Sequence, residues 1–492
     1  MNVGSIGIRV EKRHPGANIR VEKRHSYANI RVKKQHHVLT SFKFIGNIYF
    51  VNKKGDKMLK RKIEKKLYEW KNEKRTNKKC LVIKGARQVG KTYIIDKFCK
   101  ENYENYVYMN FIENPSYLDI FNGDLNVDNL IKQITINIPN VNLVPNKTVI
   151  FLDEIQECPN ARTALKFFAV DKRFDVIASA SLLGIKYKEV ISFPVGQTET
   201  LEMYSLDFEE FLWSNGISEE AIFYLKEYFE KKESVPFATH EKMMQLFREY
   251  IVVGGMPDVV LTFVETHDFN KVLEVQKNIV GDYLDDIAKY AEGNEKAKAR
   301  ECFLSIPRQL AKDSKKFQYS VVQSGGTSKK YTGSLMWLYD AGIINFCHNL
   351  SIPELPLEGN SIENQFKVYM NDTGLLISML EEGSGKDIID GNLGIYKGAI
   401  FENIIAEIFT KLKKKLYYFE YRNRLEIDFF IKKDSMPVAV EVKAADNTKS
   451  KSLKVLLENK DWDIKHAIRL SSKNIGGTEN IECFPLYMAM FM

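Results

Sequence analysis

The sequence has 492 residues, of which 44% are apolar and 28% are charged, as in ordinary globular chains with several domains. No apolar run approaches the roughly 20 residues that cross a bilayer, so we expect no membrane segment, no secretory signal and a cytoplasmic protein. The net charge of +8 comes from residues 1–57, which hold 13 Lys/Arg and 3 Asp/Glu. The charge of the whole chain therefore indicates no partner. Six scattered cysteines without a C-x-x-C pair predict reduced thiols and no zinc site.

The N-terminal segment contains a tandem repeat of 11 residues, which runs over Ile8–Asn18 and Ile19–Asn29 and degrades from Ile30. Solenoid repeats are longer and have an apolar face to stack, which this unit lacks. We interpret residues 1–57 as a basic leader that is disordered or not native, upstream of a start at Met58. The alternative is a basic arm that binds nucleic acid.

A phosphate-binding pattern follows the first short apolar run. Lys79–Lys84 reads as a buried strand, and Gly85–Thr92 then matches G-x-x-x-x-G-K-[ST] directly before a helical period. The glycines allow successive N–H groups to face an anion, the lysine reaches the β- and γ-phosphates, and the threonine hydroxyl binds Mg²⁺. ATP and Mg²⁺ are the expected cofactors. The predicted nucleotide-binding residues are Gly85, Ala86, Arg87, Gln88, Val89, Gly90, Lys91 and Thr92.

A second apolar run ends in two acids, Asp153 and Glu154. Ligands of open α/β sheets bind beyond the C-terminal ends of the strands, so Asp153 is expected to hold Mg²⁺ together with Thr92. Glu154 would polarise the attacking water, and Lys91 would neutralise the phosphates. A water-activating acid beside the magnesium acid favours hydrolysis over transfer to a small molecule. The alternative is an acidic turn after a core strand.

Two neighbouring strands are expected at Tyr106–Phe111 and Phe174–Ser179. Ser181 follows the second and is a candidate catalytic residue that senses the γ-phosphate, with a loop of small residues as the alternative. Three arginines are candidates for a stimulating cation, and the sequence does not rank them: Arg162, Arg173 and Arg248.

The middle of the chain predicts helices and then a small basic module. Residues 217–295 have helical spacing and suggest a lid. In 296–355, Phe303–Leu310 and Ser328–Leu338, with Ser328 as N-cap, precede a strand that starts at 341–344, as in a winged helix. Nine Lys/Arg against four Asp/Glu suggest contact with DNA, or alternatively a packing module with a solvated basic face. The candidate DNA contacts are Lys315, Lys316, Lys329 and Lys330.

The C-terminal region carries acids within apolar strands. Asp428 lies in one apolar run, and Glu441 and Lys443 lie in the next, which reproduces the acid…acid-x-lysine pattern of PD-(D/E)xK nucleases. Asp428 and Glu441 would bind a divalent metal, and Lys443 would position or deprotonate water. Glu402, on the apolar side of a helix that starts near Gly398, would complete the metal shell. The alternative is a structural Glu441–Lys443 pair in a degenerate nuclease fold.

Together these stretches resemble prokaryotic AAA+-type ATPases that join a P-loop domain to a C-terminal restriction-endonuclease-like domain. The matching segments are Gly85–Thr92, Leu152–Gln156, Ser192–Gly196, Met203–Leu212, Val253–Pro257 and Lys367–Leu375. The sequence departs from the family at Ala180, where a glycine is usual between two serines. The resemblance implies ATP binding and hydrolysis, and relatives often form homo-oligomeric rings with an arginine supplied in trans.

We therefore expect an α/β protein with a P-loop core, a helical lid, a winged-helix-like module and a restriction-endonuclease-like domain. The expected boundaries are 1–57 for the leader, 58–215 for the core, 216–295 for the lid, 296–355 for the middle module, 356–394 for a connector and 395–492 for the last domain. Three functions stay open: an ATP-hydrolysing switch coupled to DNA or a partner, an ATP-regulated metal-dependent DNase, and a non-catalytic regulatory protein.

Overall fold

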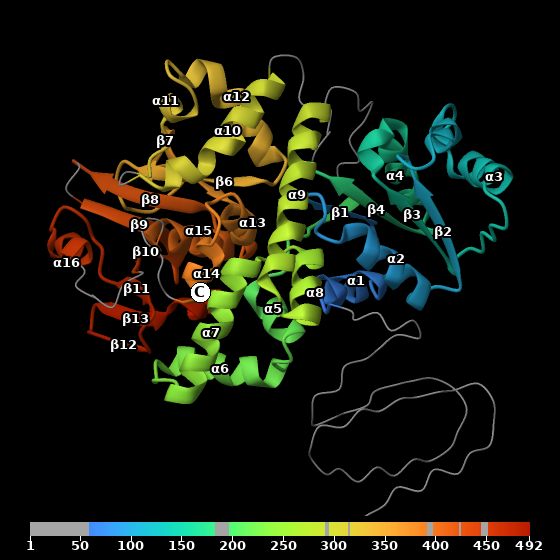
Figure 1. The fold of residues 1–492 in the computed structure, drawn as a ribbon. Coiled ribbons are helices and arrows are strands. Elements are labelled where there is room, and N and C mark those ends of the chain that lie inside the picture. The colour runs from blue at the N-terminus through green and yellow to red at the C-terminus, as the bar shows by residue number, and fades with distance from the viewer. Residues whose placement is uncertain are drawn as a thin grey trace, which may run out of the picture. The chain divides into compact units, whose positions relative to one another are not determined.

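The N-terminal part of the described chain contains a parallel five-stranded sheet (Figure 1). The computed structural model describes residues 59–182, 196–290, 295–312, 315–390, 397–422, 425–443 and 451–492. The predicted leader and most of the Ser192–Gly196 segment lie outside these ranges. In sheet order the strands are β2 (Asn105–Asn110), β3 (Thr148–Asp153), β4 (Asp175–Ser181), β1 (Cys80–Gly85) and β5 (Thr198–Glu202). Strands β3 and β4 are buried along their whole length, as their apolar runs predict.

Helices cover both faces of this sheet. Helices α1 (Ile63–Lys71) and α2 (Lys91–Asn102) share one apolar core with the sheet, and α3 (Val127–Asn137) and α4 (Pro159–Asp171) share the other. Short 3-10 turns lie at Pro115–Phe121 and Ile155–Glu157. The carboxyl ends of the parallel strands are therefore left open for a site.

A run of helices follows the sheet, as the sequence predicts. They are α5 (Phe208–Ser214), α6 (Glu219–Lys231), α7 (Phe237–Val253), α8 (Pro257–Thr266) and α9 (Phe269–Tyr290). Helix α7 ends at Gly254, which has a φ of 74°, and α8 starts at Pro257, so Gly254–Pro257 is a break between two helices. Figure 1 shows α9 running between the first sheet and the second one.

The second sheet is mixed and contains strands from two of the predicted modules. In order it consists of β12 (Gly476–Gly477), β13 (Ile481–Pro485), β11 (Ala467–Ser471), β10 (Met436–Val442), β9 (Leu425–Lys433), β8 (Leu416–Tyr421), β6 (Ile344–Leu350) and β7 (Ser361–Met370). Strand β6 confirms the strand expected after residue 341. It pairs in parallel with β8, and β7 lies within the predicted connector 356–394. The middle segment and the C-terminal domain therefore share one sheet, so the expected boundaries at 355 and 395 do not separate independent cores.

The remaining helices flank this sheet. They are α10 (Glu295–Leu310), α11 (Tyr319–Val322), α12 (Ser328–Asp340), α13 (Thr373–Ser378), α14 (Ser384–Ile389), α15 (Lys397–Lys411) and α16 (Lys451–Glu458), with a final 3-10 turn at Leu486–Phe491. Ser328 is the first residue of α12, and Thr327 is the N-cap without a side-chain bond, so the predicted cap at Ser328 is wrong by one residue. Helices α15 and α16 pack in separate apolar cores with strands of the sheet. Within the described ranges, no helix is both long and apolar enough to traverse a bilayer.

Candidate functional site

The loop between β1 and α2 takes the shape that its glycines allow. Gly90 precedes α2 with a φ of 90°, a conformation that favours glycine. A Cβ on Gly85 would lie 2.2 Å from the carbonyl oxygen of Met203, so only glycine fits there. Arg61 supports the loop from outside, since its guanidinium donates to Val89 O at 3.0 Å and to Tyr204 O at 2.7 Å. The loop is thus fixed by backbone and by a buried arginine.

Lys91 is buried inside this loop. Its Nζ donates to the backbone oxygens of Gly85 at 3.0 Å and Ala86 at 2.7 Å, and only 6% of the residue is exposed. Burial lowers the pKa of Lys91 to about 8. An ammonium whose hydrogen bonds go to backbone carbonyls would gain strongly from an additional anionic partner.

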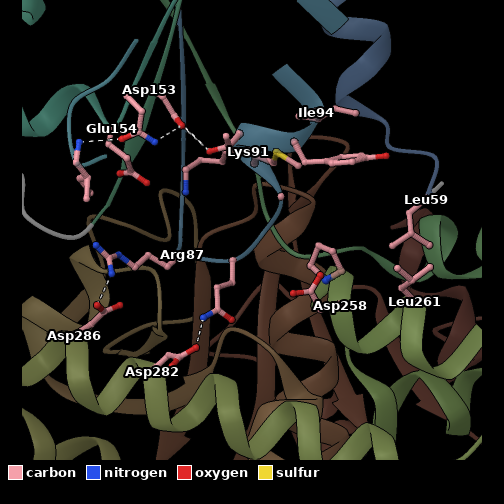
Figure 2. A pocket seen from close by; sticks show the side chains of 18 of the residues that line it. Leu59, Arg87, Lys91, Ile94, Asp153, Glu154, Asp258, Leu261, Asp282 and Asp286 are labelled. Atoms are coloured by element: carbon pink, nitrogen blue, oxygen red, sulfur yellow. Dashed lines mark hydrogen bonds and ion pairs between the residues drawn. The ribbon is translucent and has the colours of Figure 1, made fainter. Parts of the chain in front are cut away.

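Thr92 and Asp153 meet at the ends of α2 and β3. The Thr92 hydroxyl lies 3.1 Å from both carboxylate oxygens of Asp153, which is fully buried. Tyr108 donates to the same carboxylate at 2.9 Å, and Ser179 also donates to it. The ends of three parallel strands therefore converge on this acid (Figure 2).

Glu154 directly follows β3 in a left-handed conformation with a φ of 55°. Its backbone N–H donates to Ser179 Oγ at 3.0 Å, and the side-chain amide of Gln156 donates to its carboxylate at 2.5 Å. Such a backbone conformation costs about 1 kcal/mol or more for a non-glycine residue and persists only where the surroundings impose it. Here it turns the Glu154 side chain into the pocket described below.

Ser181 lies at the end of β4, where it pairs in register with Gly85 and is fully buried. Its backbone N–H donates to Gln156 Oε1 at 3.1 Å. The serine whose hydroxyl contacts Asp153 is Ser179, two residues earlier. The sensor role of Ser181 stays a prediction. Ser179 and Gln156 could not be predicted, because the residue pattern of a fully buried strand does not reveal which serine contacts the acid.

A pocket of about 900 Å³ opens beside these residues. One end is lined by Lys91, Thr92, Asp153 and Glu154, and Figure 2 shows that the other end includes Leu59, Ile94 and Leu261, with Asp258 close by. The pocket thus joins a charged end to a more apolar end.

Helix α9 closes the pocket with carboxylates. Asp286 pairs with Arg87 at 2.5 Å, and Asp282 accepts from the Gln88 amide at 2.7 Å. The side chains of Arg87 and Gln88 are therefore bound to the helical region. The sequence did not indicate this, because α9 lies almost 200 residues downstream of the loop.

The three candidate arginines lie elsewhere. Arg173 pairs with Asp171 and Asp128, and neither it nor Arg162 nor Arg248 lines the pocket. The arginines of the pocket lining are Arg61 and Arg87.

The predicted C-terminal acids lie where β9 and β10 separate. The ladder between these strands ends at the pair Phe429–Val440, and beyond it the Asp428 carboxylate accepts from the Val442 N–H at 2.8 Å. Burial and the neighbouring Glu402 raise the pKa of Asp428 to about 7. Glu441, 3% exposed, pairs with Lys443 at 2.7 Å, and its second oxygen is buried without a hydrogen bond.

Glu402 is not free to complete a metal shell in this arrangement. Its carboxylate accepts from Lys315 and from Tyr369 OH at 2.9 Å, and Lys367 Nζ lies 3.5 Å away. Across the described ranges, no group of three or more His, Cys, Asp or Glu side chains is arranged to hold a metal ion. Lys315 was expected on an exposed basic cluster and instead faces Glu402 with 16% of its side chain exposed, whereas Lys329 and Lys330 are exposed on α12.

Family comparisons match three separate stretches of the chain. Residues 77–212 match an AAA domain family, and residues 244–386 and 397–488 match two domains of unknown function, DUF8612 and DUF4143. No curated protein matches. The first stretch includes the phosphate-binding loop and the Asp153–Glu154 pair, so the part of the chain that carries the site is similar to an AAA domain.

Solved structures resemble the chain at low identity. A Walker-type ATPase of Pyrococcus abyssi is 14% identical, with a TM-score of 0.38 and coverage of 67% of this chain and 97% of its own. The Orc1 protein of Aeropyrum pernix in complex with DNA is 12% identical, with a TM-score of 0.31 and coverages of 67% and 92%. The RuvB Holliday junction branch migration motor of Thermotoga maritima is 13% identical, with a TM-score of 0.26 and coverages of 57% and 87%.

Proposed function

We propose that the chain binds ATP and hydrolyses it at the pocket beneath the β1–α2 loop. The observation that carries this proposal is the convergence of Lys91, the Thr92–Asp153 contact and Glu154 on one pocket. The glycine-bent loop and the N-terminus of α2 would bind the phosphates through N–H groups, and Lys91 would turn from its carbonyls to them.

The residues present also fit Mg²⁺. Thr92 Oγ1 and the Asp153 carboxylate offer hard oxygen ligands side by side, and Asp153 is oriented by Tyr108 and Ser179. Mg²⁺ bound with the nucleotide would neutralise charge that develops on the phosphates. Glu154 is the carboxylate placed to orient and polarise water, since Gln156 and Ser179 fix it.

The apolar end of the pocket suits the base of a nucleotide. Leu59, Ile94 and Leu261 offer apolar surface there, and the Asp258 carboxylate is an acceptor at the same end. An acceptor matches the exocyclic amine of adenine. This supports ATP as the nucleotide.

Removing the Lys91 ammonium tests the site. We expect Lys91→Ala to weaken ATP binding by about 10- to 100-fold, because a charge-assisted hydrogen bond to phosphate is worth about 1.5–3 kcal/mol, and to abolish detectable hydrolysis. Equilibrium dialysis with labelled ATP and Mg²⁺ measures the first effect. Lys100→Ala is the matched control, since Lys100 lies on the same helix and pairs with Asp96 at the surface. Equal ATP affinity in the two variants would contradict the assignment.

We further propose that the nucleotide state is coupled to the C-terminal modules, so that the protein is an ATP-hydrolysing switch. A buried polar hub, defined here as Ser205, Gly255, Asp372 and Glu407, supports this. Asp372, the N-cap of α13, accepts from Ser205 Oγ at 3.0 Å and from the Gly255 N–H at 2.8 Å. The Asp372 carboxylate thus connects three elements: the segment that follows β5, the break between α7 and α8, and helix α13.

The hub continues into α15. Glu407 accepts from the Thr373 N–H at 2.7 Å and pairs with Lys411 at 2.6 Å, and Lys411 also donates to Leu206 O at 2.8 Å. Glu407 and Lys411 are buried charges, and unpairing them would be costly. A displacement near Leu206 should therefore move α15 with it. The N–H of Met203, three residues before Leu206, donates a hydrogen bond to Lys84 O beside the phosphate-binding loop.

The finer fold assignments belong to the same proposal. Helices α10 to α12 with strands β6 and β7 are consistent with a winged-helix-like unit whose exposed Lys329 and Lys330 contact DNA phosphates. A homo-oligomer would supply a further arginine, since Arg61 and Arg87 of the pocket lining are bound to Val89, Tyr204 and Asp286 of the chain itself.

A second candidate function is ATP-regulated, metal-dependent cleavage of DNA at a restriction-endonuclease-like site. The observation in its favour is the position of Asp428 and Glu441 where β9 and β10 part, with Lys443 paired to Glu441. We expect Mn²⁺-dependent nicking of duplex or single-stranded DNA in the presence of ATP, lost in Asp428→Ala and retained in Asp461→Ala, an exposed aspartate of the same domain. Cleavage that survives Asp428→Ala, or is absent from the unaltered protein, excludes this candidate.

A further inference from the structure

Carboxylates outnumber cationic side chains in the lining of the nucleotide pocket. Helix α9 alone contributes Asp282, Asp285 and Asp286. The cationic side chains of the same lining are Arg61, Arg87, Lys91 and Lys289. The phosphates of ATP are strongly negative, so the carboxylates of α9 repel them unless cations of the pocket compensate. What holds each cation therefore decides which of them is available to a phosphate.

The two arginines of the lining are held differently. Arg61 is 7% exposed, donates to two backbone oxygens and lies 3.2 Å from Glu210, so it is fixed in place. Arg87 has 24% of its side chain exposed, and Figure 2 shows it turned toward Asp286. Its charge acts at the phosphate end of the pocket, because burial and, to a smaller extent, Arg87 lower the pKa of Lys91 to about 8.

The backbone of Arg87 is held independently of its guanidinium. Tyr283 OH donates to Arg87 O at 3.3 Å, and the neighbouring Gln88 amide donates to Asp282 at 2.7 Å. Both contacts come from α9 and involve no atom of the Arg87 side chain. The loop would therefore keep its position against α9 while the guanidinium changes partner.

Asp286 has a second cation close by on its own helix. Its side chain is 8% exposed, so an uncompensated carboxylate there would be costly. Lys289 follows three residues later on α9, a spacing at which helical side chains are neighbours. Burial raises the pKa of Asp286, and both Arg87 and Lys289 counteract this shift. Lys289 would therefore compensate Asp286 when Arg87 turns away.

We infer that Arg87 changes partner when the nucleotide binds: its guanidinium leaves Asp286 and binds the phosphates, so that the chain's own phosphate-binding loop supplies an arginine to the site. A guanidinium presents several N–H donors in one plane, which match phosphate oxygens. The same donors would stabilise charge that develops on the phosphates during hydrolysis. This inference rests on the proposed ATP site and adds a binding and catalytic residue to it.

The ATP affinities of two variants separate this exchange from a structural ion pair. Equilibrium dialysis of the full chain with labelled ATP and Mg²⁺ is the measurement. We expect Arg87→Gln to bind ATP about tenfold more weakly, because it loses a charge-assisted hydrogen bond. Asp286→Asn should bind ATP about threefold or more tightly, because the competing carboxylate is gone. A purely structural pair would be broken by either substitution, so weaker binding in both variants would overturn the inference.

Two further variants test whether the gain is a general effect of charge. Asp285→Asn is the matched control, since Asp285 is the preceding residue of α9, carries the same charge and lines the same pocket. Its gain in ATP affinity should be smaller than that of Asp286→Asn. Arg87→Gln/Asp286→Asn should bind ATP no more tightly than Arg87→Gln. A gain that persists without Arg87, or that Asp285→Asn matches, would assign it to repulsion alone and overturn the exchange.

Turnover at saturating ATP tests the catalytic part of the inference. We expect Arg87→Gln to lower phosphate release by about 10²-fold, the usual effect of removing one donor to developing charge, and turnover equal to that of the unaltered protein would contradict this. If the unaltered protein binds no ATP, the proposed site fails and the inference fails with it. If ATP binds equally well to the unaltered protein and to Arg87→Gln, the inference alone is wrong. Unchanged far-ultraviolet circular dichroism verifies folding of each variant.

Discussion

Glu154→Gln is expected to reduce steady-state ATP turnover by about 10²- to 10⁴-fold, the usual contribution of a positioned acid–base group. The amide keeps the shape of the side chain and still accepts the hydrogen bond from Gln156, but it cannot take a proton from water. Lys91, Thr92 and Asp153 are unchanged, so ATP should bind with the same or higher affinity. Phosphate release and equilibrium dialysis measure the two quantities separately.

Glu157→Gln is the control for this variant, since Glu157 lies in the 3-10 turn that directly follows Glu154 and does not line the pocket. We expect its turnover to equal that of the unaltered protein. If Glu154→Gln retains more than a third of the original turnover, another group activates the water and the role given to Glu154 is wrong.

Gly255→Ala, which adds a methyl group inside the buried polar hub, is expected to lower the free energy of unfolding strongly. A Cβ there would lie 2.0 Å from Leu206 O, with Leu206 N and C at 2.9 and 3.0 Å, all of them backbone atoms. To relieve this clash, the chain must break either the 2.6 Å hydrogen bond from the Leu206 N–H to Gly255 O or the 2.8 Å hydrogen bond from the Gly255 N–H to Asp372. We expect a loss of at least about 3 kcal/mol, measured as a lower midpoint of urea unfolding, and reduced soluble yield.

Gly281→Ala is the matched opposite. Gly281 lies within α9, and no atom lies within 4 Å of a Cβ built there. The substitution should raise stability by about 0.5–1 kcal/mol, because alanine loses less conformational entropy than glycine in a helix. Similar unfolding midpoints for the two variants would show that Gly255 is not a close-packed contact.

The candidate nucleotide site could be predicted because its residues are close together in the sequence. Gly85–Thr92 is one continuous segment, and Asp153 and Glu154 end an apolar run, so strand, loop and acid could be placed without knowing the fold. The buried strands β3 and β4 followed from the same runs. What the sequence could not indicate is the far side of the pocket, because Asp282 and Asp286 are ordinary polar positions of an amphipathic helix until packing brings them to Arg87 and Gln88.

The C-terminal site shows the same limit. Charges within apolar runs predicted Asp428, Glu441 and Lys443. The structure places Asp428 in β9, Glu441 in the adjacent strand β10, and Lys443 directly after β10. Lys315 comes from the predicted basic module 296–355 and Lys367 from the predicted connector 356–394. Their contact with Glu402 depends on β6 and β7 joining the sheet of the C-terminal domain. Net charge per segment cannot reveal which lysines are paired inside.

The shared sheet has a consequence for dissecting this protein. The stretches that match DUF8612 and DUF4143, residues 244–386 and 397–488, meet within one sheet, where β6 pairs with β8. A fragment cut between them would present an unpaired apolar strand edge on either side and should aggregate. We therefore expect the two stretches to fold as one unit, and co-expression of both fragments should restore solubility to each.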